Sequence, residues 1–319
     1  MSDETNNTMK AILIHTHGGP EVLVYEDAPR PVAGTGEVLI RVYAAGVNPA
    51  DWKTRAVPSR LAPSAFPAIL GWDVSGMVET VGPDVTEFRE GDAVYGMIRF
   101  PKPGAAYAEY ATAPVTDIAR KPTIVDHVHA AAVPLAALTA WQALVEQAHL
   151  SEGQTILITG AAGGVGHFAV QLAKAKGAHV IGAASARNVE FLRGLGVDQV
   201  IDYTTTPLDK AVQGVDVVFD TVGGGTREQA IDVLKCGGTL VSTVVGRPSE
   251  EHVSAASIQA RGMLVHPSSE QLTEIARLID EDRVRPVVDT VFPLADTRKA
   301  HELSESGHVR GKVVLRVVG

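Results

Sequence analysis

A glycine-rich turn between two apolar segments is the first stretch of this sequence whose residue types and spacing indicate chemistry. The letters TGAAGGVGHF span residues 159–168, after the apolar run 155–158 and before apolar residues at helical spacing. A strand, a tight turn and a helix N-terminus in this order bring backbone N–H groups up to a pyrophosphate. In the G-x-G-x-x-G fingerprint Ala161 takes the first glycine position, with Gly163 and Gly166 in the others. Such a turn is also found as an ordinary connection between a strand and a helix. The elements around it must therefore show whether it binds a pyrophosphate.

Short β-branched segments that alternate with helical ones surround this turn. They are residues 155–158, 179–184, 199–201, 215–220 and 238–242. The alternation predicts a parallel sheet with helices on both faces, and ligands of such sheets bind at the carboxyl ends of the strands. We therefore expect a bound dinucleotide. The turn residues expected to contact it are Ala162, Gly163, Gly164, Val165 and Gly166. Those expected after the fourth and fifth strands are Val222, Gly223, Val244 and Val245, with Asp220 bordering the cleft.

The residues after the second strand of this sheet indicate which dinucleotide binds. NAD sites usually place an acidic residue about twenty positions past the glycines, where it bonds the ribose 2′-hydroxyl. Here the first acid after Gly166 is Glu190, inside the next predicted helix, and the strand ends instead at Ser185 and Arg187. A hydroxyl and a guanidinium suit a 2′-phosphate, so we expect NADPH. The alternative is that Ser185 caps a helix and Arg187 is solvated.

Composition excludes several other classes of protein. The chain has 319 residues, 20% of them charged and 45% hydrophobic, with a net charge of −9. This charge argues against nucleic-acid or membrane-surface binding, and no apolar run reaches the roughly 18 residues of a membrane span. The polar start lacks the features of a signal peptide. Cys236 is the only cysteine, which fits a reducing cytoplasm, so we expect a cytoplasmic protein.

The sequence before residue 150 has a different pattern of predicted elements. Residues 38–47, 74–81 and 93–97 are short predicted strands broken by Gly, Pro and Asp, which suggests a distorted antiparallel barrel. An alanine-rich helical region, 130–147, leads to the glycine turn, with Pro134 at its start or at a kink. A helix at 270–282 and strands at 287–292 and 312–317 follow, and we expect these strands to complete the barrel. The predicted division is a tail at 1–8, a first domain at 9–128, a nucleotide domain at 129–262 and a returning segment at 263–319.

Several ordered motifs resemble the medium-chain dehydrogenase/reductase superfamily. They are AAGVNPADWK (44–53), GWDVSGMVETVG (71–82), FREGDAVYGM (88–97), PLAALTAWQAL (134–144), AAGGVG (161–166), VIDY (200–203) and GKVVL (311–315). Together they look like its zinc-free NADPH:quinone oxidoreductase and enone reductase branch. The resemblance implies an α/β fold class: a GroES-like distorted β-barrel completed by the C-terminal segment, with an inserted Rossmann doubly wound parallel sheet.

The same resemblance lets us ask whether zinc is expected. Zinc-using relatives have Cys near the position of Asn48 and His at that of Trp72, and neither an amide nor an indole nitrogen is a competent zinc ligand. The stretch 98–104 is too short for their four-cysteine loop. The pairs His15/His17 and His127/His129 have chelating spacing but no further partners nearby, so we expect solvated loop histidines and no metal.

For cofactor contacts, the resemblance implies that Asn48 lies beside the nicotinamide ribose and Thr139 beneath the ring. It also implies that Tyr203 neighbours the adenosine or its phosphate, although an ordinary surface tyrosine is nearly as good an interpretation. Asn48 has a competing interpretation as well, because Asn-Pro is a common turn opener.

For catalysis, Asn48, Lys53 and Tyr95 are the candidate residues. Lys53 lies in a predicted helical turn and is a candidate hydrogen-bond donor to a substrate carbonyl, or else simply solvated. Tyr95 is a second candidate donor, with plain packing as the alternative. We expect Trp52 to pack and Asp73 to be structural.

The function predicted from these features is NADPH-dependent reduction of quinones, or of the β-carbon of enones. One alternative is reduction of an enoyl thioester, which requires a basic binding surface that the sequence does not make obvious. Another is a non-enzymatic NADPH-binding regulator. We expect a small-molecule substrate, no nucleic acid and no membrane, and the resemblance alone suggests a homodimer.

Overall fold

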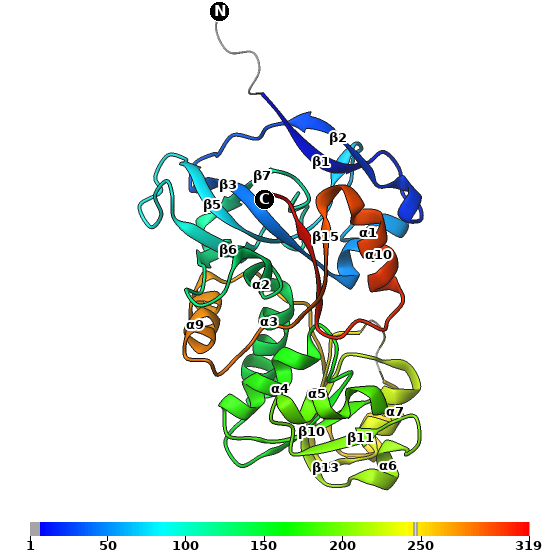
Figure 1. Cartoon of the computed structure of the whole chain (residues 1–319). Coiled ribbons are helices and arrows are strands. Elements are labelled where there is room, and N and C mark those ends of the chain that lie inside the picture. The colour runs from blue at the N-terminus through cyan, green and yellow to red at the C-terminus, as the bar shows by residue number, and fades with distance from the viewer. Residues whose placement is uncertain (1–6, 245, 247, 319) are drawn as a thin grey trace, which may run out of the picture. The chain divides into compact units, whose positions relative to one another are not determined.

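The computed structural model describes residues 7–244, 246 and 248–318, and the chain divides into two compact units (Figure 1). Unit 1 comprises Met1–Leu138, His266–Asp282 and Pro286–Gly319, and unit 2 comprises Thr139–Val265 with Arg283–Arg285. The tail predicted for residues 1–8 lies outside the described residues up to residue 6, and Thr8 already belongs to a strand.

Unit 1 is built mainly on antiparallel strands, and its long central strands are buried at most positions. One pair, Val288–Pro293 with Lys312–Arg316, is parallel. One sheet has the order β15-β16-β3-β5-β6-β8, with β7 also paired to β3, and a smaller sheet has the order β2-β1-β4. The strands are β1 (Thr8–Ile14), β2 (Val24–Pro29), β3 (Glu37–Val47), β4 (Ala68–Ile69), β5 (Asp73–Val81), β6 (Ala93–Met97), β7 (Tyr110–Pro114), β8 (Ile118–Arg120), β15 (Val288–Pro293) and β16 (Lys312–Arg316). Strand β16 pairs with β3, so the C-terminal segment completes the barrel as predicted.

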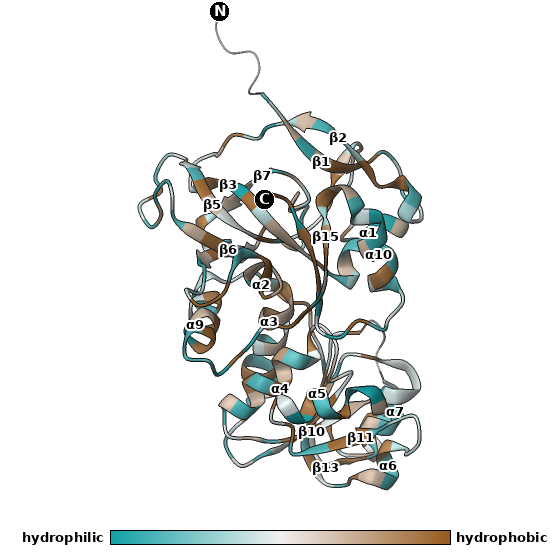
Figure 2. Cartoon of the chain, in the orientation of Figure 1, coloured by the Kyte–Doolittle hydropathy of each residue, from teal (hydrophilic) through white to brown (hydrophobic). Residues whose placement is uncertain are grey.

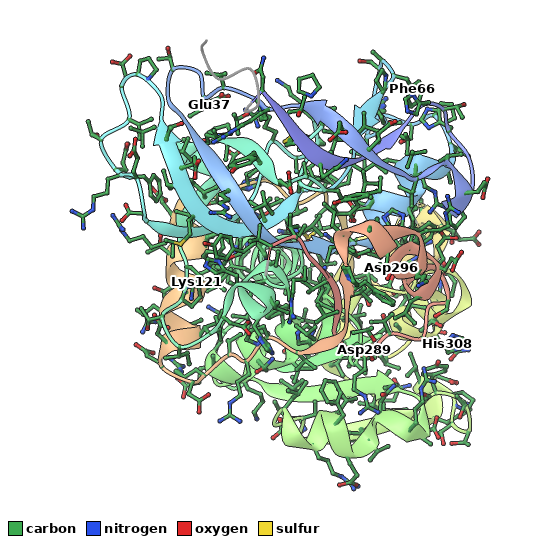
Figure 3. The ribbon with its side chains drawn as sticks, turned by 45° about the horizontal axis from the view of Figure 1, so that its top comes forward. Glu37, Phe66, Lys121, Asp289, Asp296 and His308 are labelled. Atoms are coloured by element: carbon green, nitrogen blue, oxygen red, sulfur yellow. The ribbon has the colours of Figure 1, made fainter. Side chains whose placement is uncertain are left out.

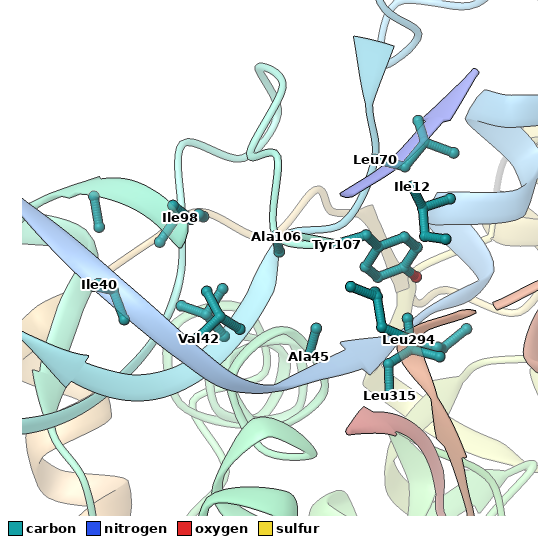
Figure 4. Packing of buried hydrophobic residues seen from close by; sticks show 14 of the residues in the cluster. Ile12, Ile40, Val42, Ala45, Leu70, Ile98, Ala106, Tyr107, Leu294 and Leu315 are labelled. Carbon is teal, nitrogen blue, oxygen red and sulfur yellow. The ribbon is translucent and has the colours of Figure 1, made fainter. Parts of the chain in front are cut away.

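The interior of the barrel is filled by side chains from strands that are far apart in the sequence. The Tyr107 ring lies with Ile12, Leu70, Leu294 and Leu315 in one cluster (Figure 4). At the periphery of unit 1, by contrast, polar pairs form: Glu37 accepts a hydrogen bond of 2.6 Å from Arg99 Nη2 (Figure 3).

Helices cover this unit where the chain leaves and re-enters the barrel. They are α1 (Pro49–Ala56), α2 (His127–Ala131), α9 (Ser269–Asp280) and α10 (Thr297–Glu305), with short 3-10 turns at η2 (Pro20–Val22), η3 (Val115–Asp117) and η6 (Leu294–Asp296). Helix α9 buries the apolar face formed by Leu272, Ile275 and Ile279 and leaves its other face polar (Figure 2). No helix in the described part of the chain is long and apolar enough to cross a membrane.

Unit 2 contains the parallel sheet predicted from the alternating segments. Its order is β11-β10-β9-β12-β13-β14, and neighbouring strands are parallel. The strands are β9 (Thr155–Thr159), β10 (His179–Ala184), β11 (Gln199–Asp202), β12 (Val215–Asp220), β13 (Leu234–Ser242) and β14 (Gln259–Gly262). The helices are α4 (Gly166–Ala175), α5 (Val189–Gly194), α6 (Leu208–Ala211), α7 (Gly224–Ile231) and α8 (Glu250–Ala255), with the 3-10 turn η5 (Ala186–Asn188). The strand order reverses between β9 and β12, the position where open α/β sheets bind their ligands.

The predicted helical region 130–147 divides in the structure. Helix α2 ends at Ala131, Pro134 begins α3 (Pro134–Trp141), and a π-helix, η4 (Gln142–Gln147), follows directly. The first unit boundary falls after Leu138, later than the predicted end at residue 128. The reason is packing, because Ala131 and Ala132 lie in one buried cluster with barrel residues Ala44 and Val314.

Candidate cofactor and catalytic sites

The turn between β9 and α4 requires glycine at positions that side chains would block. Gly160 has a φ of +62°, and a Cβ there would lie 2.5 Å from Thr221 Oγ1. A Cβ at Gly166, the first residue of α4, would clash with Gly160 O and lie 2.7 Å from Ala161 Cα. The left-handed residue is therefore Gly160, one position before the first glycine position of the assigned fingerprint, which the buried Ala161 fills. The sequence signal was present, since Gly160 stands two positions after the end of the predicted strand, 155–158.

A buried carboxylate holds together the strand ends next to this turn. Asp220 is fully buried, and its Oδ1 accepts hydrogen bonds from Thr159 Oγ1 at 2.9 Å and Gly223 N at 2.9 Å. Its Oδ2 accepts one from Ser242 Oγ at 2.8 Å. The ends of β9, β12 and β13 are thus joined through one side chain. Asp220 organises the edge of the sheet from inside, and its expected place beside a cofactor cleft stays a prediction.

The backbone beyond these strand ends is shaped by a second left-handed glycine. Gly223 has a φ of +77°, and a Cβ there would lie 2.7 Å from Val244 Cγ1. Val222 beside it is 50% exposed. Val245, also predicted to contact the cofactor, lies outside the described residues.

The end of β10 carries the residues predicted to select the cofactor. Ser185 is the N-cap of η5, but its hydroxyl makes no capping bond and instead accepts a hydrogen bond of 3.3 Å from Asn188 Nδ2. Arg187 is exposed, and Tyr203, after β11, is 54% exposed. Two acids lie in this region. Glu190 lies in α5 and pairs with Arg193, while Asp202 Oδ1 accepts bonds from the backbone and hydroxyl of Thr204.

In unit 1, Asn48 is both the opening residue of a helix and part of a buried network. It is the N-cap of α1, with Pro49 following, and its backbone N–H donates to Asp51 Oδ2 at 2.6 Å. Its side-chain Nδ2 donates to Asp73 Oδ2 at 2.9 Å, and its Oδ1 accepts a hydrogen bond from Lys312 Nζ. Asn48 therefore opens a helix where the competing interpretation expected a turn, and its amide is in addition fixed at both ends. Its contact with the nicotinamide ribose stays a prediction.

The charges around Asn48 are almost completely shielded from water. Asp51 and Asp73 are fully buried and Lys312 is 3% exposed. Burial raises the pKa of the Asp51 carboxyl to about 7 and that of Asp73 to about 6. Burial also lowers the pKa of the Lys312 ammonium, against the opposing effect of the two carboxylates. Asp73 Oδ1 accepts the Leu135 backbone N–H at 2.8 Å, which agrees with the structural role predicted for Asp73. Sequence reasoning missed Lys312, whose only signal was a charge at the start of an otherwise mostly apolar strand.

The two predicted proton donors have different surroundings. Lys53 is exposed on α1, with Nζ 5.3 Å from the centre of the Trp52 ring, and its role toward substrate stays a prediction. Tyr95 is fully buried, and its hydroxyl donates to Leu272 O at 2.5 Å. Burial also raises its pKa. We correct the catalytic interpretation of Tyr95 accordingly, since its proton is already used to hold α9. Thr139 is buried at the start of unit 2, and its contact with a cofactor stays a prediction.

The histidine pairs do not resemble metal sites. His15 bonds Glu26 at 2.5 Å, and His17 Nδ1 lies 3.2 Å from Arg55 O. His127 and His129 lie on α2 and not in a loop, where His127 Nδ1 is 2.8 Å from Ser75 Oγ. Burial lowers the pKa of His127 to about 4. Within residues 7–244, 246 and 248–318 no group of three or more His, Cys, Asp or Glu side chains is placed to hold a metal ion.

A cavity of about 720 Å³ opens elsewhere in unit 1, between β8 and α9. Phe88, Ile118, Arg120 and Arg277 are among the residues that line it, and none of the predicted site residues does.

Comparisons with known proteins agree with this architecture. Residues 34–123 match the alcohol dehydrogenase GroES-like domain, and residues 195–315 match a family described as zinc-binding dehydrogenase. The mitochondrial NAD(P)H oxidoreductase RTN4IP1 of Danio rerio is 33% identical over 97% of this chain and 92% of its own length. The chloroplastic NADPH-dependent alkenal/one oxidoreductase of Arabidopsis thaliana is 35% identical over 96% of this chain and 79% of its own. A solved quinone oxidoreductase from Coxiella burnetii has a TM-score of 0.91 and 40% identity, covering 98% of this chain and 100% of that one.

The chain therefore belongs to the medium-chain dehydrogenase/reductase superfamily, with the GroES-like barrel and Rossmann sheet that define it. Within the superfamily it falls among the quinone oxidoreductases and enone reductases. It is an oxidoreductase that uses a nicotinamide cofactor and a small-molecule substrate.

Proposed function

We propose that the protein is an NADPH-dependent, zinc-independent reductase that transfers hydride to quinones or to the β-carbon of α,β-unsaturated carbonyl compounds. The observation that carries this proposal is the chemistry around position 48. An amide held by Lys312 and Asp73 occupies the position at which zinc-using relatives have cysteine. Without a metal, developing oxygen charge must be stabilised by hydrogen bonds, which suits a delocalised enolate or hydroquinone better than an alkoxide.

The residues of unit 2 fit a dinucleotide. The glycines at 160 and 166 leave room for the close strand-to-helix turn, so the N-terminus of α4 is available to a pyrophosphate. Ser185 and Arg187 would hold a 2′-phosphate, because the nearby carboxylates of Glu190 and Asp202 are engaged by Arg193 and Thr204. The Arabidopsis relative, named as NADPH-dependent, supports this choice of cofactor.

When bound, the cofactor would supply the hydride. In unit 1, Asn48 would contact its ribose, and Lys53 would donate a hydrogen bond to the substrate oxygen as charge develops there. The proton that completes the reduction can come from water, so no further acid is required of the chain.

The proposal is tested by locating the transferred hydride in the product. With an α,β-unsaturated ketone and NADPH deuterated at the transferred position, we expect the label at the β-carbon and a saturated ketone as product, identified by NMR. Label at the carbonyl carbon, with an allylic alcohol as product, would refute the enone-reductase proposal.

The enoyl-thioester alternative is separated by the same assay. Turnover of an enoyl-CoA without turnover of enones or quinones would favour it. The relatives reported above carry enzyme names, which favours an enzyme over a non-enzymatic regulator. A cytoplasmic location and a homodimer are further parts of the proposal, the dimer resting on the family resemblance.

A further inference from the structure

Both polar ends of the Asn48 side chain are held by partners that accept only one orientation of the amide. Lys312 Nζ is a pure donor and contacts Oδ1, while Asp73 Oδ2 lies 2.9 Å from Nδ2. In the flipped amide, Nδ2 would face the ammonium and Oδ1 would face the carboxylate. Donor would then meet donor and acceptor would meet acceptor, with no water to relieve either contact. The chemistry of the partners therefore fixes the polarity of the amide.

Lys312 is itself held in place independently of Asn48. Its Nζ also donates to Val47 O at 2.9 Å, and it lies 3.8 Å from Asp73 Oδ2. Lys312 opens β16, the strand that pairs with β3 next to Asn48. The ammonium is thus anchored to the barrel by the backbone of β3 and by a buried charge.

From this geometry we infer that Lys312 is a positioning residue that, with Asp73, orients Asn48 so that its remaining Nδ2–H is presented to the cofactor as a hydrogen-bond donor. One Nδ2–H is used by Asp73, and Lys312 withdraws electron density from the amide through Oδ1. The second Nδ2–H is then a strengthened donor of fixed direction. It would bond a ribose hydroxyl oxygen and leave the proton of that hydroxyl available to the substrate oxygen. The inference rests on the proposed function, in which Asn48 lies beside the nicotinamide ribose.

A double-mutant cycle on NADPH binding tests this inference without requiring turnover. The variants are Lys312→Met, which keeps the aliphatic stem, Asn48→Ala, and the two combined. The measurement is the dissociation constant of NADPH, followed by the fluorescence of the reduced nicotinamide. We expect Lys312→Met to weaken binding by about tenfold, because the Asn48 amide loses the partner that fixes its orientation and strengthens its donor to the cofactor. In the Asn48→Ala background, the same substitution should weaken binding by less than about twofold, because its effect passes through Asn48.

Two controls keep the result interpretable. Arg30→Met removes another ion pair of unit 1, to Glu79, and should leave NADPH affinity unchanged. If Lys312→Met does not fold, Lys312→Met with Asp51→Asn removes one buried acid together with the buried cation, and the cycle is repeated in that background.

Equal weakening by Lys312→Met with and without Asn48 would overturn the inference, and so would unchanged affinity in a folded variant. The proposed function fails in a different way, through the absence of enone or quinone turnover by the parent protein while NADPH still binds.

Discussion

At the scale of residues, the sequence identified candidate site residues, but it did not identify their hydrogen-bond partners. Asn48 was a candidate from its motif, but the partners that orient it, Asp73 and Lys312, are 25 and 264 positions away along the chain. Tyr95 was wrong as a donor for the same reason, since its acceptor is the carbonyl of Leu272, 177 positions away. Side-chain chemistry is local, whereas burial and pairing depend on contacts that only the fold creates.

Arg187 carries a prediction at this scale. Arg187→Ala should weaken NADPH binding by roughly ten- to a hundredfold and leave NADH binding nearly unchanged, because a charge-assisted contact to phosphate contributes about 1.5–3 kcal/mol. The measurement is the dissociation constant of each cofactor. Arg277→Ala, on α9 in unit 1, makes the same charge change at a residue that pairs with Glu274, and should bind NADPH like the parent. A variant at Arg187 that binds both cofactors normally would show that the 2′-phosphate is held elsewhere.

At the scale of elements, strands were predicted closely. The spacing of their apolar residues and the Gly, Pro and Asp residues that end them are both local features of the sequence. The predicted bounds of β6, β10 and β12 match the structure, and β13 begins earlier than predicted. The long helical region was predicted as one element, yet it contains Pro134 and a π-helix. Proline is well tolerated at the first position of a helix, so Pro134 can begin a new helix. The sequence alone did not distinguish this start from a kink within one helix. The turn after β9 was predicted in type, but the assigned fingerprint began at Ala161 and so did not include the left-handed Gly160.

This turn gives a prediction for Gly166. In Gly166→Ala the new Cβ meets backbone atoms of Gly160 and Ala161, which cannot move aside as a side chain would. We expect at least about tenfold weaker NADPH binding and a lower thermal midpoint, since a backbone clash costs more than an ordinary surface change. Gly194→Ala on α5 is the matched control, because nothing lies within 4 Å of the Cβ it adds. Parent-like affinity and stability at Gly166→Ala would mean that the turn does not need this glycine.

At the scale of the whole molecule, the ordered motifs were enough to predict the superfamily and the return of the C-terminal strands to the barrel. The boundaries between the two units were harder to predict from the sequence, because they are set by side-chain packing. The segment before Leu138 joins the barrel through small buried alanines that carry no special signal in the sequence.

Whether the protein binds zinc is a question about the whole chain. It arises because residues 195–315 match a family described as zinc-binding dehydrogenase. Trp72, at the position where zinc-using relatives have histidine, donates from Nε1 to Lys102 O at 2.7 Å, and its ring packs edge-on against Phe100. Asn48 is fixed by Lys312 and Asp73, and an ammonium beside it would repel a divalent cation.

We therefore expect the purified protein to contain far less than one zinc per chain by elemental analysis, and to keep its reductase activity after dialysis against EDTA. Added zinc should not raise the activity, because residues 48 and 72 offer it neither a thiolate nor an imidazole. One tightly bound zinc per chain, whose removal abolishes activity and whose return restores it, would contradict this prediction. It would also require the oxyanion to be stabilised by a metal and not by the amide network around Asn48.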